Sequence, residues 1–169
     1  QETKILDQYY IKNGGLIVVF PFLQYAFFRL NLTDKNNRLK DETSKSNAAQ
    51  FIEFLHTGNF ENSTMRMGLN KLLCGIDIND AIASEFIFSK EENKKQEEET
   101  LVKSVAEKIF MEISTRWTNL LKVLKNYDEY DEFKNISDDQ IIRDYIFSRD
   151  AVINAYGTEV NGEKNILYY

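Results

Sequence analysis

The chain has 169 residues, a length typical of one domain with its own hydrophobic core. Its 43% apolar and 28% charged residues are ordinary for a globular protein, whereas one proline and seven glycines argue against a β-sandwich or β-barrel, which needs many tight turns. The balance of 21 basic against 27 acidic residues disfavours a nucleic-acid or anionic-membrane partner, and a single cysteine excludes an internal disulfide.

The first part of the chain combines a glycine break with the most apolar run. Gly14 and Gly15 interrupt regular structure, and residues 16–32 follow as the apolar run. A transmembrane helix needs about 20 predominantly apolar residues, and this run is broken by Pro21 and carries Arg29. We therefore predict a buried helix that is entered through a kink at Pro21.

Short helices are predicted through the middle of the chain. After a polar loop, Ser46 or Asn47 can cap a helix that ends at Gly58. A second helix is expected over residues 65–74. A third is expected to start at residues 77–80 and to run to about residue 86.

The clearest predicted element is a long amphipathic helix from about Ser89 to Asn126. Its start, residues 90–100, is almost wholly charged or amide, and we expect these first turns to be solvated and to project beyond the body. The apolar residues that follow recur at spacings of three and four, and they are Leu101, Val105, Ile109, Ile113, Trp117, Leu120, Leu121 and Leu124.

The C-terminal part changes from helical to β-prone sequence. An acidic linker at residues 127–133 leads to a predicted helix capped by Ser137. Residues 151–169 hold two β-prone runs on either side of Asn161-Gly162, which signals a β-hairpin; we expect it to pack on the helices. The predicted fold class is mainly α: one helical domain over residues 1–169, with one long amphipathic helix and a small C-terminal β-hairpin as an appendage.

Few residues could carry catalysis. His56 is the only histidine and Cys74 the only cysteine, so a nucleophilic pair would need both; His56, near a predicted helix end, is better explained as a cap of backbone carbonyls. Neither residue fits a zinc pattern, and residues 128–132 lack the glycine and ligand spacing of a calcium loop. We predict no catalytic residue, no metal site and no cofactor.

Two polar residues interrupt the otherwise apolar helix at residues 68–75. In one interpretation Asn70 bonds to a neighbouring backbone group while Lys71 extends its charged end to the surface. In the other, Lys71 faces a partner. Residue chemistry alone thus predicts a helical interaction module rather than an enzyme.

Three segments, in this order, resemble the motifs of a known family. Residues 13–23 (NGGLIVVFPFL) resemble its N-A/G-G-L-V-L-L-x-P-F-L signature, residues 48–58 (AAQFIEFLHTG) resemble its A-x-x-L-L-x-x-L-x-T-G helix, and residues 68–75 (GLNKLLCG) are similar to its L-x-L-N-K-L-L-C-G motif. Weaker similarities are Glu91-Glu92, Trp117 and residues 142–149 (IRDYIFSR). The family is the tape measure proteins of bacterial contractile injection systems, phage-tail-like particles that drive an inner tube through a contracting sheath.

The resemblance implies structural work rather than catalysis. Family members help to set the length of the inner tube and contact tube, spike or baseplate components, in the bacterial cytoplasm during assembly and then within the particle. No nucleic-acid partner and no membrane insertion are implied, and a homo-oligomer is one expected arrangement. The motif and possible interaction residues that the resemblance implies are Gly14, Gly15, Pro21, Phe22, Asn70, Lys71, Cys74 and Gly75.

The sequence departs from the family pattern at both ends, which affects the predicted extent of the protein. The long N-terminal region of the family and its L-P-W … P-W-M ending are absent from these residues, so we expect the C-terminal globular region of a longer protein. Even one uninterrupted helix of this length would reach only about 250 Å, so the ruler itself would lie in the parent chain. The alternative hypothesis is a helical adaptor or chaperone-like module that binds an effector or assembly client; an exposed apolar patch would support it, and residues 20–28 and Tyr168-Tyr169 supply the apolar material.

Overall fold

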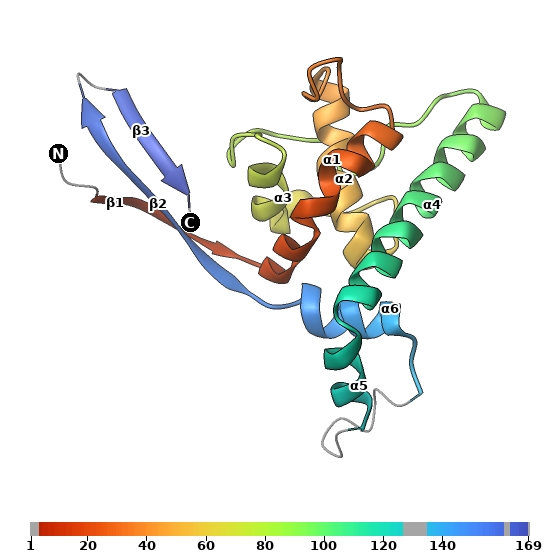
Figure 1. Ribbon diagram of the computed structural model, residues 1–169. Helices are drawn as coiled ribbons and strands as arrows, with labels where there is room; N and C mark the ends of the chain where they lie inside the picture. Colours follow the sequence, from red (N-terminus) through yellow and green to blue (C-terminus); the bar gives the residue numbers. More distant parts are fainter. Residues whose placement is uncertain (1–3, 127–134, 161–162, 169) are drawn as a thin grey trace.

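A computed structural model describes residues 4–126, 135–160 and 163–168, and it shows a helical body from which a three-stranded sheet extends (Figure 1). The predicted fold class, mainly helical with a long helix and a C-terminal hairpin, is confirmed. The elements in chain order are β1 (Lys4–Ile11), the 3-10 helix η1 (Gly14–Val19), α1 (Phe20–Arg29), α2 (Glu42–Thr57), the 3-10 helix η2 (Thr64–Arg66), α3 (Gly68–Leu73), α4 (Glu92–Arg116), α5 (Thr118–Asn126), α6 (Asp138–Ile141), the π-helix η4 (Ile142–Phe147), β2 (Ala151–Val160) and β3 (Glu163–Tyr168).

The predicted kink at Pro21 takes the form of a change of helix type. The chain runs as the 3-10 helix η1 up to Val19, and α1 begins at Phe20 with Pro21 in its first turn. Proline suits this place because the first turn of an α-helix needs no bond from its backbone nitrogen. The prediction that this helix is buried is wrong: only Leu23, Ala26 and Phe27 of α1 are buried, and its other residues are partly or fully exposed.

The helix α2 lies at the centre of the body. All residues from 48 to 55 are buried, so α2 is enclosed on every side by α3, η1 and η4. It begins at Glu42 and is not capped by the predicted Ser46 or Asn47, because the Asp41 carboxylate accepts a hydrogen bond from the Ser44 backbone N–H at 2.7 Å and caps the helix five or six residues earlier. Its end at Gly58, with φ of 73°, is as predicted.

The Asp41 cap makes the stability of α2 dependent on pH. The hydrogen bond from Ser44 lowers the pKa of the Asp41 carboxyl. The stabilisation is therefore present above the unfolded-state pKa and is lost as the pH falls through the lower, folded-state pKa. Asparagine caps as well as aspartate but does not titrate. We expect Asp41→Asn to leave stability near pH 7 unchanged and to reduce its loss below about pH 4, as urea unfolding across this pH range would measure. An unchanged acid-side slope would contradict the assignment.

The helix predicted from residues 77–80 to about residue 86 is wrong. Asp77 forms a turn, in which its carboxylate accepts the Asn79 backbone N–H at 2.8 Å. Beyond it residues 81–88 form no helix, because side chains of α2 bond to their backbone N–H groups. Ser46 Oγ accepts the Ala83 N–H at 3.0 Å, and Asn47 Oδ1 accepts the Ile87 N–H at 2.8 Å. Tertiary hydrogen bonds thus replace those that a helix would have supplied.

The long helix is present but divided. α4 covers 25 residues and buries a stripe at helical spacing, while its first turns at residues 92–97 are exposed as expected. The helix stops at Trp117, where the backbone leaves helical geometry with φ of −109°. There the Thr118 hydroxyl donates to the carbonyls of Ser114 and Thr115, which competes with the helical bonds, and α5 starts anew at Thr118. The single helix predicted up to Asn126 is therefore two.

The next predicted helix begins where the sequence places its cap. The Ser137 hydroxyl accepts the Gln140 backbone N–H at 3.2 Å, and the chain continues from α6 into the π-helix η4. The π-helix buries Ile142, Ile146 and Phe147 against the core. The predicted acidic linker at residues 127–133 lies outside the described residues.

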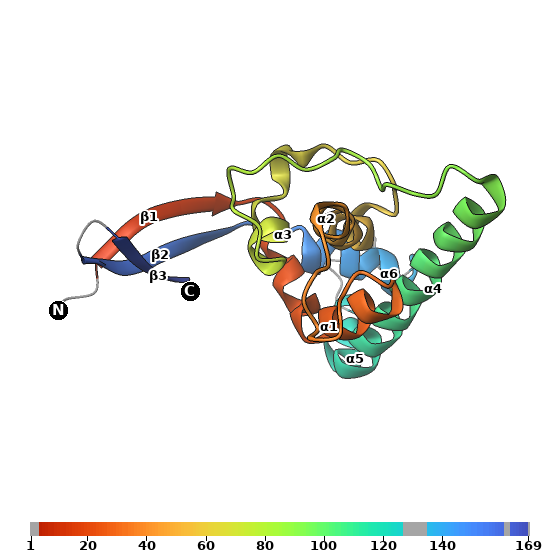
Figure 2. The same cartoon turned by 90° about the horizontal axis from the view of Figure 1, so that it is seen from above.

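The sheet differs from the predicted hairpin in two ways. β2 and β3 form the antiparallel hairpin, whose Asn161-Gly162 turn lies outside the described residues, but β1 adds a third strand, so the order is β1-β2-β3. The hairpin was expected to pack on the helices, and instead the sheet leads away from them as an arm (Figure 2). Its base is held to the body by Ile11, which is buried. A third strand replaces the support that packing on helices would have given a lone hairpin.

Candidate functional site

The first and third motifs meet the central helix at the base of the arm. η1 carries Gly14 and Gly15, α3 carries Asn70 and Lys71, and both elements contact α2. η1 also packs against η4 and β2, so the junction ties the body to the arm. This junction is the candidate functional site.

The two glycines of the first motif allow backbones to touch. A Cβ atom on Gly15 would lie 1.7 Å from the Ile146 carbonyl oxygen, and one on Gly14 would lie 2.6 Å from the Ala151 Cβ. The Gly15 backbone N–H donates to the Arg149 carbonyl at 3.0 Å, which requires this close approach. The glycines therefore allow close packing at the junction. The sequence predicted a break in regular structure here, and the interaction role that the resemblance implies for Gly14 and Gly15 stays a prediction.

Asp150 bonds to several residues at the base of the arm. Its carboxylate accepts hydrogen bonds from the Tyr10 hydroxyl and from the Asn13 backbone N–H, and lies 3.5 Å from Lys12 Nζ. The hydrogen bond from Tyr10 is the main cause that lowers the pKa of Asp150 and raises the pKa of Tyr10. Asn13 adopts a left-handed backbone conformation with φ of 58°, which turns the chain from β1 into η1. Asp150 carried no sequence signal, because its partners are about 140 positions away.

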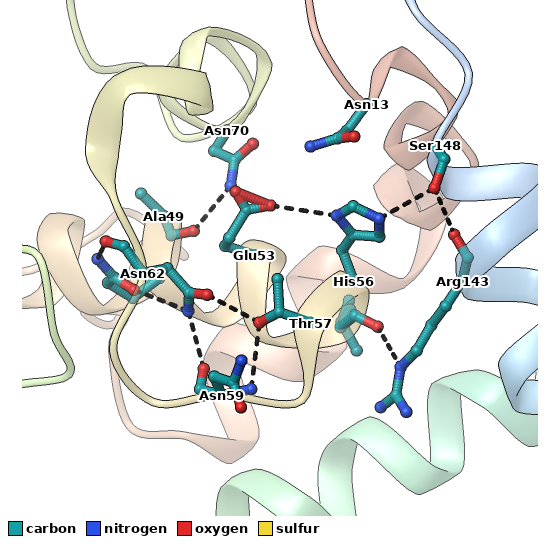
Figure 3. Close-up of polar contacts among 12 residues, drawn as sticks. Asn13, Ala49, Glu53, His56, Thr57, Asn59, Asn62, Asn70, Arg143 and Ser148 are labelled. Carbon is teal, nitrogen blue, oxygen red and sulfur yellow. Dashed lines mark hydrogen bonds and ion pairs between the residues drawn. The ribbon is translucent and has the colours of Figure 1, made fainter.

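A polar network joins the end of α2 to η4 (Figure 3). Ser148 donates its hydroxyl proton to the Arg143 carbonyl at 2.9 Å, so its oxygen accepts from His56 Nε2 at 3.1 Å. The other ring nitrogen of His56 lies 3.7 Å from Oε1 of the buried Glu53. The expectation that His56 caps carbonyls is wrong, because the ring bonds to Ser148 instead.

Arg143 caps the end of α2 in place of His56. Its Nε donates to the Leu55 carbonyl at 3.0 Å, and its guanidinium lies 4.8 Å from the centre of the Phe110 ring on α4. A positive charge at a helix C-terminus is favourable, because the last carbonyls carry partial negative charge. Arg143 lies in the weakly similar segment 142–149, the one signal that could have indicated this role.

The third motif is held by internal hydrogen bonds. Asn70 Nδ2 donates to the Ala49 carbonyl of α2 at 3.1 Å, which agrees with the structural interpretation of this residue. Lys71 is only 9% exposed, and its ammonium donates to the carbonyls of Ile78 at 3.3 Å and Asp80 at 2.6 Å. In the described structure this lysine therefore fastens the segment after α3. A contact between Lys71 and a partner stays a prediction.

The other motif residues lie in the first turn of α1 and just after α3. Pro21 is exposed, and Phe22 is half-buried with the Arg116 guanidinium 4.9 Å from its ring centre. Gly75 ends the α3 region with φ of 68°, a left-handed conformation that favours glycine. Cys74 is buried, and its burial raises the pKa of the thiol to about 12, so the reactive thiolate is scarce at neutral pH. Interaction roles for these four residues stay predictions.

The described residues give no geometry for a Cys–His pair or a metal centre. His56 is engaged with Ser148 and Glu53, and none of its bonds in the part of the chain that the structure describes involves Cys74. Within these residues no three His, Cys, Asp or Glu side chains are placed to hold a metal ion. Nor does any helix among them have the length and apolar character to cross a membrane.

The glycines of this site allow close backbone contacts, and its polar side chains bond to groups of the same chain. These features are typical of a structural site that holds segments of one protein together. Comparison with known proteins then gives the family. The contractile injection system tape measure protein family matches residues 1–123, so the chain belongs to this family, whose members are structural components of the injection particle. No curated protein and no solved structure matches the chain.

Proposed function

We propose that residues 1–169 act as a non-catalytic anchoring module of a tape measure protein. In this role the module helps to set inner-tube length by fixing the protein to tube, spike or baseplate components. It acts in the bacterial cytoplasm during assembly and afterwards within the particle. The partners are proteins of the particle.

The observation that carries this proposal is the folding of the family motifs into one junction. A ruler must be extended, whereas residues 13–23, 48–58 and 68–75 are packed around the base of the arm. The longest helix, α4, has 25 residues and spans only about 37 Å. A folded body of this kind is suited to hold a position rather than to measure a distance.

Electron microscopy of particles tests the proposal. Cells would carry in-frame deletions along the gene that encodes this chain, and negative-stain images would give the distribution of tube lengths. We expect deletion of residues 10–150 to abolish normal particles. Deletions elsewhere in the gene should shorten tubes in proportion to the residues removed. Unchanged tube lengths with normal assembly would overturn the proposal.

The second candidate is a helical adaptor or chaperone-like module, and one observation favours it. Three large apolar side chains of η1 and α1 are exposed: Ile17 at 50%, Phe20 at 57% and Phe28 at 67%. Exposed apolar side chains of this size can contact a client protein. This candidate takes first place if deletion of the module leaves tube length and assembly normal but causes loss of an effector from purified particles.

A further inference from the structure

A pocket of about 310 Å³ opens beside the start of α4 and has phenylalanine rings in its wall. Phe60, Phe86 and Phe88 line it, with the Phe60 and Phe88 ring centres 5.3 Å apart edge to face, and those of Phe86 and Phe88 5.2 Å apart in a stack. Phe60 and Phe88 are half-buried, so part of each ring is open to solvent. The face of an aromatic ring attracts cations.

Two glutamates are placed opposite each other at this pocket. Glu61 and Glu85 are partners in an isolated antiparallel bridge. Two backbone hydrogen bonds flank the bridge. The Asn62 N–H donates to the Ser84 carbonyl at 2.8 Å, and the Phe86 N–H donates to the Phe60 carbonyl at 2.9 Å. In this non-hydrogen-bonded type of pair the side chains approach most closely, and like charges directly opposite are destabilising. A cation bound by both glutamates would relieve this repulsion.

The other charged groups of the pocket leave it negative. Glu99 also lines the wall, and its carboxylate lies 4.0 Å from Lys95 Nζ, the one ammonium among the lining residues. Among the described residues, neither Glu61 nor Glu85 forms an ion pair within 4.0 Å, and both side chains are exposed. Within the chain, Lys103 Nζ already lies 5.8 Å from the Phe60 ring centre, a cation–π contact with one of the pocket rings.

We propose that this pocket binds an arginine side chain presented by a partner protein. A guanidinium is planar, stacks on aromatic rings and donates to two carboxylates at once, whereas an ammonium is a compact point charge. The proposal deepens the anchoring function and rests on it for the origin of the partner. It assigns the contact chemistry to the region where the acidic start of α4 meets residues 60–62 and 84–88.

Titration of the 15N-labelled full chain with the peptide Gly-Gly-Arg-Gly-Gly tests the proposal. We expect saturable chemical-shift changes confined to the amides of residues 60–62, 85–89 and 95–99. The same peptide with citrulline in place of arginine keeps the shape but lacks the charge, and it should give no localised changes. Absence of localised shifts at millimolar peptide, or equal shifts with the citrulline peptide, would overturn the assignment.

Substitution of both glutamates separates binding from folding. In the double variant Glu61→Gln with Glu85→Gln we expect about tenfold weaker binding of the arginine peptide, because two charge-assisted hydrogen bonds become neutral ones. The melting temperature should rise, because the opposed charges are removed. The matched control, Glu97→Gln with Glu107→Gln, changes net charge equally at exposed positions of α4 outside the pocket and should bind as the unmodified chain does.

The outcomes are distinguishable from those of the particle experiment. Equal binding by the double variant and its control would show that the carboxylates do not contact the ligand, and it would overturn the pocket assignment while leaving the anchoring function untouched. Unchanged tube lengths after deletion of the module would overturn the anchoring function, and the peptide titration would still report on the pocket.

Discussion

Gly15→Ala is expected to lower the free energy of unfolding by about 3 kcal/mol or more. The new Cβ would lie 1.7 Å from the Ile146 carbonyl oxygen and 2.7 Å from its carbonyl carbon. These are backbone atoms of η4, which cannot rotate away, so η1 must separate from η4. The hydrogen bond from Gly15 to the Arg149 carbonyl would be lost as well. Urea unfolding followed by circular dichroism measures the change.

Two further variants serve as controls for Gly15→Ala. Gly75→Ala meets no atom within 4 Å, so its cost is that of a left-handed alanine, about 1 kcal/mol. Gly14→Ala meets the Ala151 Cβ, so Ala151→Gly should partly restore its stability. The same second change should not restore Gly15→Ala, because that clash is with backbone. Equal losses for Gly15→Ala and Gly75→Ala would contradict the packing role of Gly15.

Lys71→Met is expected to lower the free energy of unfolding by about 2 kcal/mol. Methionine can follow the same buried path but cannot donate, so the carbonyls of Ile78 and Asp80 lose their bonds to the ammonium. Hydrogen exchange should accelerate over residues 76–80, because the lysine fastens this segment to α3. Unfolding experiments and exchange mass spectrometry on the same variant measure the two effects.

An exposed lysine gives the matched control for Lys71→Met. Lys94 lies on the solvated start of α4, and its ion pair with Glu91 at 3.8 Å is at the surface. Lys94→Met should therefore change stability by no more than about 0.5 kcal/mol. If Lys71→Met is as stable as Lys94→Met but prevents particle assembly, Lys71 contacts a partner instead of holding the fold.

Two helix ends and the apolar stripe of α4 were predictable because they depend on local chemistry. Gly58 supplies the left-handed residue that ends α2, and Ser137 supplies the oxygen that caps α6. The stripe through Val105, Ile109 and Ile113 repeats at helical spacing and faces the core as α4. These features involve residues within one turn of each other, or one repeating pattern.

The family was likewise predictable from the sequence, since it depends on motifs at residues 13–23, 48–58 and 68–75 that can be recognised in linear order. The reason for those motifs was not. Gly15 is needed because Ile146 lies against it, and Lys71 is buried because the carbonyls of Ile78 and Asp80 turn toward it.

By itself, then, the sequence determined the helical class, the end of α2 at Gly58, the start of α6 after Ser137, the hairpin strands and the family, because each depends on neighbouring residues or on motifs in linear order. Only the tertiary structure decided the rest. β1 is a strand because β2, some 140 positions later, pairs with it. Residues 83–87 are not helical because α2 side chains bond to their backbone. The pairing of Glu61 with Glu85 could not be predicted from the sequence either. Contacts between distant segments compete with local propensity, and they prevail where they satisfy more backbone groups.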